Sequence, residues 1–203
     1  MIDPLAGMLW MTAVSAFLLA YYFWVSASKG AHTQQAGSTT VSFSTPTVFK
    51  LDTSVITLGA IGAFVAITGL WMIMVWPLVS SYNILFGEIY TAYGFLLLSG
   101  AVAVAKGFDL KPLSIFGGIM GIWGLIDAYG ILVRGMTSEP TIAAGLYIMG
   151  ALAGFLSIPA TFRPSKATAV AFIVFAVLFG LFALAIGAPA SFEHLSAFAK
   201  YSP

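Results

Sequence analysis

The sequence predicts an all-α, polytopic integral membrane protein, a six-transmembrane-helix bundle with both termini outside. Three observations support this fold class. Of the 203 residues, 60% are hydrophobic and only 7% are charged, whereas charged residues make up about 25% of an ordinary soluble domain. Six stretches of the sequence are apolar over about 20 residues, the length that crosses a bilayer as a helix. Lys and Arg also gather on one side of these stretches, as they do in cytoplasmic loops.

The six spans are expected to form a single transmembrane domain over residues 1–203, because each helix in lipid satisfies its own backbone and the connections are mostly short. The expected spans are residues 5–25, 54–78, 84–105, 112–133, 141–161 and 167–187. A polar loop at about 26–53 separates the first span from the second. A short amphipathic tail at about 191–200 follows the sixth span and is typical of a helix lying at the membrane surface.

The distribution of basic residues predicts the orientation. The connections after the first, third and fifth spans carry Lys29, Lys50, Lys106, Lys111, Arg163 and Lys166. The opposite side carries Arg134 and Lys200. Because Lys and Arg favour cytoplasmic loops, the first side is expected to be cytoplasmic, in a multi-pass protein of the cell membrane.

Several function classes lack support in the sequence. The net charge of +1 gives no basic patch for nucleic acid. The chain has no cysteine, which excludes disulfides, iron–sulfur clusters and thiolate zinc sites. Serine hydrolase, zinc protease, Walker and dinucleotide motifs are missing from it. We therefore expect no catalytic residue, no cofactor and no enzymatic activity.

Two acidic residues inside the spans are the most informative. A charge at the bilayer centre costs about 2.5–3.5 kcal/mol or more, so it normally faces a partner or water. Glu88 and Asp127 lie in consecutive spans, each about six residues from the outer side, which is roughly 9 Å deep at 1.5 Å per residue. Because consecutive helices are usually neighbours, the two carboxyl groups are expected to face one space.

Helical spacing extends these two positions into a polar path. Thr91, Phe95 and Ser99 share the face of Glu88 in the third span, and Trp123 and Phe116 share the face of Asp127 in the fourth. Tyr90, Tyr129 and Arg134 add hydrogen-bonding groups at similar depths. The residues of the predicted path are Glu88, Asp127, Thr91, Ser99, Phe95, Trp123, Phe116, Tyr90, Tyr129 and Arg134.

Three interpretations of the acidic pair stay open. In the first, Glu88 and Asp127 interact with Arg134, tyrosine hydroxyls or backbone and so fix the outer ends of two helices. In the second, they line the mouth of a path that is gated by their protonation. In the third interpretation they bind a divalent metal together with His194, since carboxylates and one histidine suffice for such an ion.

Residues 93–128 resemble the AmiS/UreI family of urea and amide channels. The likeness rests on Tyr93-Gly94-Phe95 and on the turn Gly107-Phe108-Asp109-Leu110-Lys111-Pro112-Leu113-Ser114, which leads into a glycine-rich span. The resemblance implies six spans, both termini outside and a homo-oligomer with one pore in each subunit. It also implies a passive channel or carrier for a small neutral polar solute of the urea, short amide or ammonia class.

Two further expectations accompany this resemblance. The size and span layout also suggest an uncharacterised family of small prokaryotic polytopic membrane proteins. The alternative function is a non-catalytic structural subunit of a larger, respiratory-type membrane complex. The absence of cofactor ligands and the many Gly and Ala residues on the helix surfaces favour that alternative as much as a channel.

Overall fold

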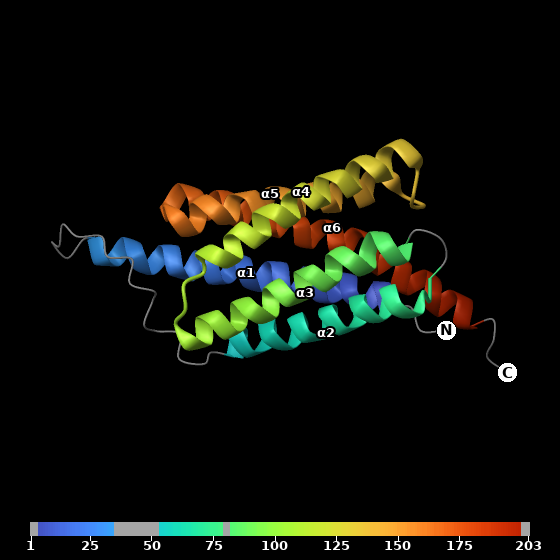
Figure 1. Ribbon diagram of the computed structural model, residues 1–203, viewed down its shortest axis with the longest axis horizontal. Coiled ribbons are helices and arrows are strands. Elements are labelled where there is room, and N and C mark those ends of the chain that lie inside the picture. The colour runs from blue at the N-terminus through green and yellow to red at the C-terminus, as the bar shows by residue number, and fades with distance from the viewer. Residues whose placement is uncertain (1–3, 35–52, 79–81, 200–203) are drawn as a thin grey trace.

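The computed structural model describes residues 4–34, 53–78 and 82–199, and this part of the chain is built of six long α-helices (Figure 1). They are α1 (Pro4–Gln34), α2 (Thr53–Val75), α3 (Tyr82–Lys106), α4 (Lys111–Arg134), α5 (Pro140–Phe162) and α6 (Lys166–Ala199). All six are long and apolar enough to cross a membrane. The predicted six-span membrane bundle is therefore confirmed, and the protein is a multi-pass membrane protein in contact with the lipid bilayer.

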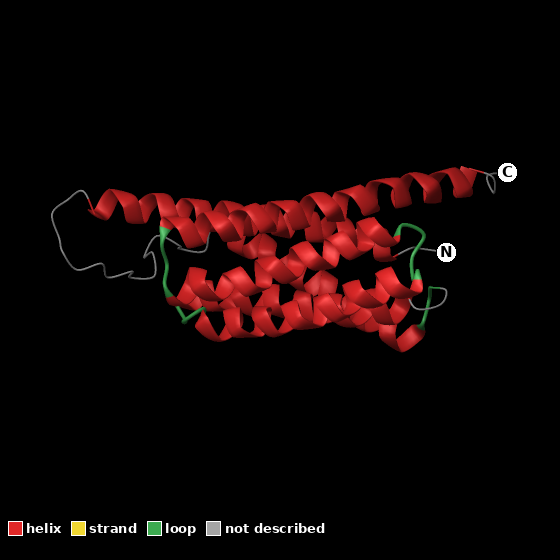
Figure 2. Cartoon of the chain, turned by 90° about the horizontal axis from the view of Figure 1, so that it is seen from above, coloured by secondary structure: helices red, strands yellow, loops and turns green. Residues whose placement is uncertain are grey.

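The helices run alongside one another, with their connections at two ends of the bundle (Figures 1 and 2). We call these the Lys111 end, where α4 begins, and the Arg134 end, where α4 stops. Three pairs of helices pack along much of their length: α2 with α3, α4 with α5, and α1 with α6. Contacts between α3 and α4, and between α1 and α2, are sparse. The α2–α3 pair therefore meets the other four helices along two loose seams.

Small residues explain the closeness of the tight pairs. A Cβ atom added at Gly94 of α3 would lie 2.3 Å from the Ala66 nitrogen of α2. One added at Gly154 of α5 would lie 2.4 Å from the Gly117 oxygen of α4. No side chain fits at either distance, so the helix backbones touch directly, as they often do in lipid.

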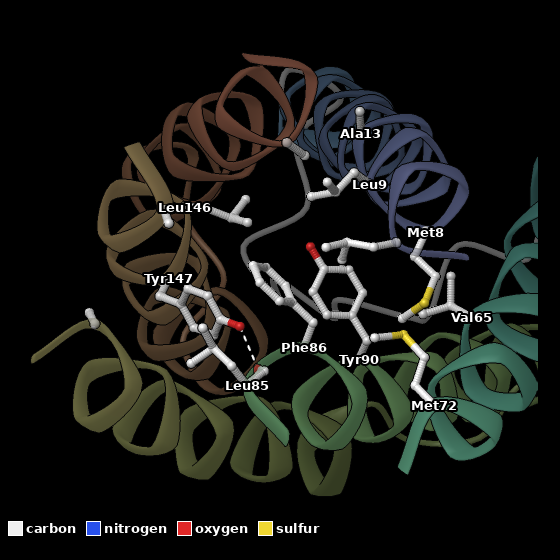
Figure 3. Packing of buried hydrophobic residues seen from close by; sticks show 14 of the residues in the cluster. Met8, Leu9, Ala13, Val65, Met72, Leu85, Phe86, Tyr90, Leu146 and Tyr147 are labelled. Carbon is white, nitrogen blue, oxygen red and sulfur yellow. Dashed lines mark hydrogen bonds between the residues drawn. The ribbon is translucent and has the colours of Figure 1, made fainter. Parts of the chain in front are cut away.

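The core at the Arg134 end is solid. Its fully buried side chains come from several helices and include Met8, Leu9, Val65, Met72, Phe86, Ile131 and Leu146. Figure 3 looks into this region and shows Phe86 in the middle, between Tyr90 and Tyr147. The ring of Phe86 lies 6.0 Å from the Tyr90 ring and 5.8 Å from the Tyr147 ring, measured between centroids. These aromatic contacts fill the centre of the bundle at this depth.

Two helices are longer than the sequence predicted. Residues 26–34 belong to α1 rather than to the predicted polar loop, and the rest of that loop, residues 35–52, lies outside the described residues. The hydroxyl of Ser28 donates to the carbonyl oxygen of Trp24 at 2.9 Å, so a polar side chain is satisfied by its own helix and need not end it.

The predicted separate tail at about 191–200 is also corrected, because residues 191–199 continue α6 without a break, past Pro189. A hydrogen bond between helices supports this continuation. The indole nitrogen of Trp10 donates to the Ser191 hydroxyl at 3.0 Å, and that hydroxyl donates to the Gly187 oxygen at 2.8 Å. At Ser191, just beyond Pro189, α6 is therefore held against α1.

Candidate binding cavity

A cavity of about 220 Å³ lies inside the bundle, in the half toward the Lys111 end. All six helices contribute to its wall, which includes Ala16 of α1, Leu58 of α2, Leu97 of α3, Gly121 of α4, Ala151 of α5 and Phe172 of α6. At one end it stops at Tyr90, Leu146 and Tyr147, next to the solid core. We call this the closed end of the cavity. At the other end, Leu110 and Thr161 line it near the Lys111 end.

Glycine and loose packing create this space. Gly100 on α3, Gly117, Gly121 and Gly124 on α4, and Gly150 and Gly154 on α5 all line the cavity. A Cβ atom added at Gly100 would meet nothing within 4 Å. The two loose seams add to the effect, because the α2–α3 pair does not close tightly on the other helices. The hollow is thus a consequence of small side chains facing one another across the bundle.

The wall of the cavity is almost wholly apolar. Among the described lining residues none is charged, and most of the hydroxyl groups already have partners inside the protein. Tyr93 shares a hydrogen bond of 2.9 Å with Ser15, and Tyr147 donates to the Leu85 carbonyl oxygen. Thr161 reaches Ser114 at 2.7 Å. A wall of this kind offers few hydrogen bonds to water and favours apolar molecules.

Tyr90 is the exception among these hydroxyl groups. Its side chain is 4% exposed, and its hydroxyl has no hydrogen-bond partner in the described part of the chain. The Thr12 hydroxyl is close enough to act on it as a hydrogen-bonding group, although the two oxygens do not meet the full geometry of a hydrogen bond and Thr12 donates to the Met8 oxygen at 2.8 Å. A buried polar group without a partner is uncommon in proteins and calls for an explanation.

Of the predicted path residues, only Tyr90 lines the cavity. Phe95 is 51% exposed and Tyr129 is 70% exposed, both on outer surfaces of the bundle. Phe116, Ser99 and Arg134 are exposed as well. The inner face of α3 carries Tyr90, Tyr93, Leu97 and Ala101, about half a turn away from the face of Glu88, Phe95 and Ser99. The predicted path and the cavity wall therefore use different faces of α3.

Two further predicted residues also lie outside the cavity wall. Thr91 donates to the Gly87 oxygen at 2.6 Å and packs against Gly69, so it belongs to the contact between α3 and α2. Trp123 is half-buried on α4, whereas its neighbour Gly124 lines the cavity.

Glu88 and Asp127 do come together. Each is half-buried, and their carboxyl groups lie within range of like-charge repulsion across the seam between α3 and α4. Asp127 is also in electrostatic range of Tyr147 at the closed end. Neither acid lines the cavity, and Arg134 forms an ion pair with neither of them in the described structure.

The predicted metal site does not assemble. Within residues 4–34, 53–78 and 82–199, no group of three His, Asp or Glu side chains is placed to hold an ion. His194, the third ligand of that hypothesis, lies exposed in the last turns of α6.

The cavity wall contains residues that the sequence analysis did not predict as part of a site. They are the glycines of the wall and two tyrosines, Tyr93 and Tyr147. The glycines carried a usable signal, because Gly117, Gly121 and Gly124 recur at helical spacing on one face of α4. A face with so little side-chain volume must be covered by a close neighbour or leave a space. On α4 the glycine face packs closely against α5 along one part and leaves the cavity open along another.

Comparison with known proteins corrects the proposed resemblance. No curated protein and no solved structure matches the chain. A family model does match, over residues 1–197, and it is not that of the AmiS/UreI channels. The short motifs shared with those channels are composed of ordinary turn residues, which arise independently in unrelated proteins. Because the match spans nearly the whole length, the chain belongs to the family described as "Protein of unknown function (DUF981)".

Proposed function

We propose that this protein binds an apolar molecule taken from the bilayer, in the cavity lined by its six helices. The observation that carries the proposal is the cavity itself, about 220 Å³ of space with an apolar wall and no charged lining residue among those described. An empty space of that size forfeits packing contacts along its whole surface. An apolar occupant restores them at no cost in desolvated polar groups.

The volume limits the kind of occupant. An engineered apolar cavity of about 150 Å³ in another protein stays dry and binds benzene or xenon. The present cavity is larger than that, but smaller than the 300–1,000 Å³ or so that is typical of sites for drug-sized ligands. One aromatic ring system or a short length of alkyl chain matches this space. The loose seam between α3 and α4 is the route we favour for its entry from lipid.

Photolabelling with an alkyl diazirine in proteoliposomes tests the proposal. We expect peptide mapping to find label on cavity residues such as Leu97. The variant Gly100→Phe fills the open space beside α3 and should abolish that label. The control is Val102→Phe, which adds a ring to the same helix at a position that is 50% exposed to lipid. Labelling confined to outward residues such as Ile119 in all three proteins would contradict the proposal.

A path for a small polar solute is the second candidate function. The specific observation in its favour is the proximity of Glu88 and Asp127 across the α3–α4 seam, toward the Arg134 end of the bundle. The test is flux of urea, acetamide and ammonia into proteoliposomes. The wild type should exceed empty vesicles, and a Glu88→Gln/Asp127→Asn double variant should change the rate. If both proteins match empty vesicles for all three solutes, this candidate should be dropped.

A further inference from the structure

We infer that the cavity takes the alkyl chain of an anionic amphiphile from the bilayer, whose charged headgroup stays outside the cavity at Lys106 and Lys111. The inference rests on the proposed function, since it names the class of apolar molecule that the cavity accepts. Two observations carry it together. The cavity reaches the Lys111 end along the loose α3–α4 seam, and the two lysines stand on either side of that seam.

The cavity is long and narrow. Its wall runs from Tyr90 to Val104 on α3 and from Gly124 back to Leu110 on α4. Each of these stretches rises about 21 Å at 1.5 Å per residue. A volume of about 220 Å³ spread over that length suits a single chain better than a compact ring system. The wall ends in the last turn of α3 and at the start of α4.

The two lysines lie where this wall ends. Lys106 is the last residue of α3 and Lys111 is the first residue of α4. Figures 1 and 2 show the short connection between them stretched from one helix end to the other. Both side chains are exposed, while Val104 and Leu110 beside them line the cavity. Such lysines lay their apolar stems along a helix and hold the ammonium group in the polar layer of a membrane.

The positive charge at this end is largely uncompensated. Within the described residues, Lys106, Lys111, Arg163 and Lys166 lie there with a single acid, Asp109. Asp109 pairs with Lys111 at 3.5 Å, but the two side chains are 61% and 46% exposed, and exposed pairs of this kind contribute little. Lys106 has no ion pair in the described part of the chain. An anionic headgroup at the seam therefore meets free positive charge.

The rest of the molecule does not offer the same match. A headgroup inside the cavity finds no counter-charge among the described lining residues, and a buried charge without one is strongly disfavoured. At the other end of the bundle, Glu139 and Glu193 lie on described helices or their caps with Arg134, and the solid core blocks the way to the cavity. The chain of the ligand therefore enters from the Lys111 end and points toward the closed end.

The test is competition against the diazirine label on Leu97 by two probes with the same chain, dodecyl phosphate and dodecanol. Both are used at equal concentrations in phosphatidylcholine bilayers, which carry no net charge. A lysine near a membrane surface contributes about 5-fold to the affinity for an anionic lipid. With the wild type, dodecyl phosphate should therefore compete at least about 5-fold more strongly than dodecanol. Lys106→Gln/Lys111→Gln should bring the two probes to equal strength.

Two control variants remove a positive charge elsewhere. Lys166→Gln alters the same end of the bundle at the start of α6, and Arg134→Gln alters the far end of α4. Both should keep the wild-type preference for the phosphate. Because all of these side chains are exposed, every variant should match the wild-type midpoint in SDS titrations, and dodecanol should compete equally with all of them.

The outcomes separate this inference from the proposed function. Equal competition by the two probes in the wild type overturns the anionic ligand and leaves the cavity as a purely apolar site. A phosphate preference that survives in Lys106→Gln/Lys111→Gln, or that Lys166→Gln abolishes as well, overturns the place of the headgroup at the seam. Failure of both probes to compete with the wild type overturns the inference and the proposed function together.

Discussion

The Tyr147 hydroxyl donates a hydrogen bond to the carbonyl oxygen of Leu85, and this bond joins α5 to α3 at the closed end of the cavity. Both residues are buried, and the ring of Phe86 stands beside Tyr147 at 5.8 Å between centroids. The bond crosses the bundle between helices that are not neighbours around the ring. It therefore fixes the width of the bundle where the solid core gives way to the cavity.

Replacing Tyr147 tests the contribution of this contact. Tyr147→Phe keeps the ring and removes the hydrogen bond to Leu85. Loss of a buried hydrogen bond typically costs about 0.5–1.5 kcal/mol, so we expect the free energy of unfolding in bicelles to fall by about 1 kcal/mol. The exposed Tyr129→Phe provides the control, with no change expected. Wild-type stability in Tyr147→Phe would show that the contact contributes nothing.

Two glycines of α3 should respond oppositely to the same substitution. Gly94→Ala places a Cβ atom against the backbone of Ala66, which cannot move aside, so the α2–α3 pair must separate. We expect a loss of several kcal/mol, in the range of severe overpacking, or failure to fold. Gly100→Ala meets open space and should leave stability unchanged or raise it by up to about 1 kcal/mol. Comparing the SDS midpoints of the two variants checks both expectations, and similar midpoints would contradict them.

The hydroxyl cluster near the Lys111 end should make a small contribution. Thr161→Val removes the 2.7 Å hydrogen bond to Ser114 while preserving the shape of the side chain. Hydrogen bonds between membrane helices average about 0.6 kcal/mol, so we predict a loss of that size. Thr161→Ser retains the hydroxyl and should recover most of it. A loss above about 2 kcal/mol in Thr161→Val would mean that the cluster holds α4 and α5 together more strongly than its geometry indicates.

The acidic pair should show energetic coupling. Glu88 and Asp127 repel each other across the α3–α4 seam when both are ionised. Glu88→Gln and Asp127→Asn should therefore each stabilise the protein at neutral pH, and the double variant should gain less than the sum of the two. Unfolding measurements on the four proteins of this cycle give the coupling free energy. Strict additivity would place the carboxyl groups beyond range of each other.

The six helices could be predicted from the sequence, because a stretch of about 20 apolar residues between polar connections has few alternatives to a membrane-spanning helix in lipid. Helix ends were less predictable. The predicted loop at about 26–53 and the predicted tail at about 191–200 both start within a helix, and the hydroxyls of Ser28 and Ser191 each bond to the preceding turn of that helix. A serine at the end of an apolar stretch is therefore compatible with the start of a loop and also with a further turn of the helix.

The site was predicted only in part. Proximity of Glu88 and Asp127 followed from their matched depth in consecutive helices, and the structure brings them together. The inward face of each helix did not follow, because α3 carries polar side chains on opposite faces, such as Glu88 on one and Tyr90 on the other, so its pattern does not distinguish lipid from core. Glu88 was assumed to face inward, whereas Phe95 and Ser99 on its face of α3 are exposed and do not line the cavity.

What fills the cavity is the central question, and xenon answers it most directly. Crystals of the protein pressurised with xenon give anomalous scattering wherever the gas occupies dry apolar space. We predict a strong xenon peak beside Leu97 and Gly121, absent from crystals of Gly100→Phe. Ordered water molecules at that position with no xenon bound would contradict an apolar binding site in this bundle.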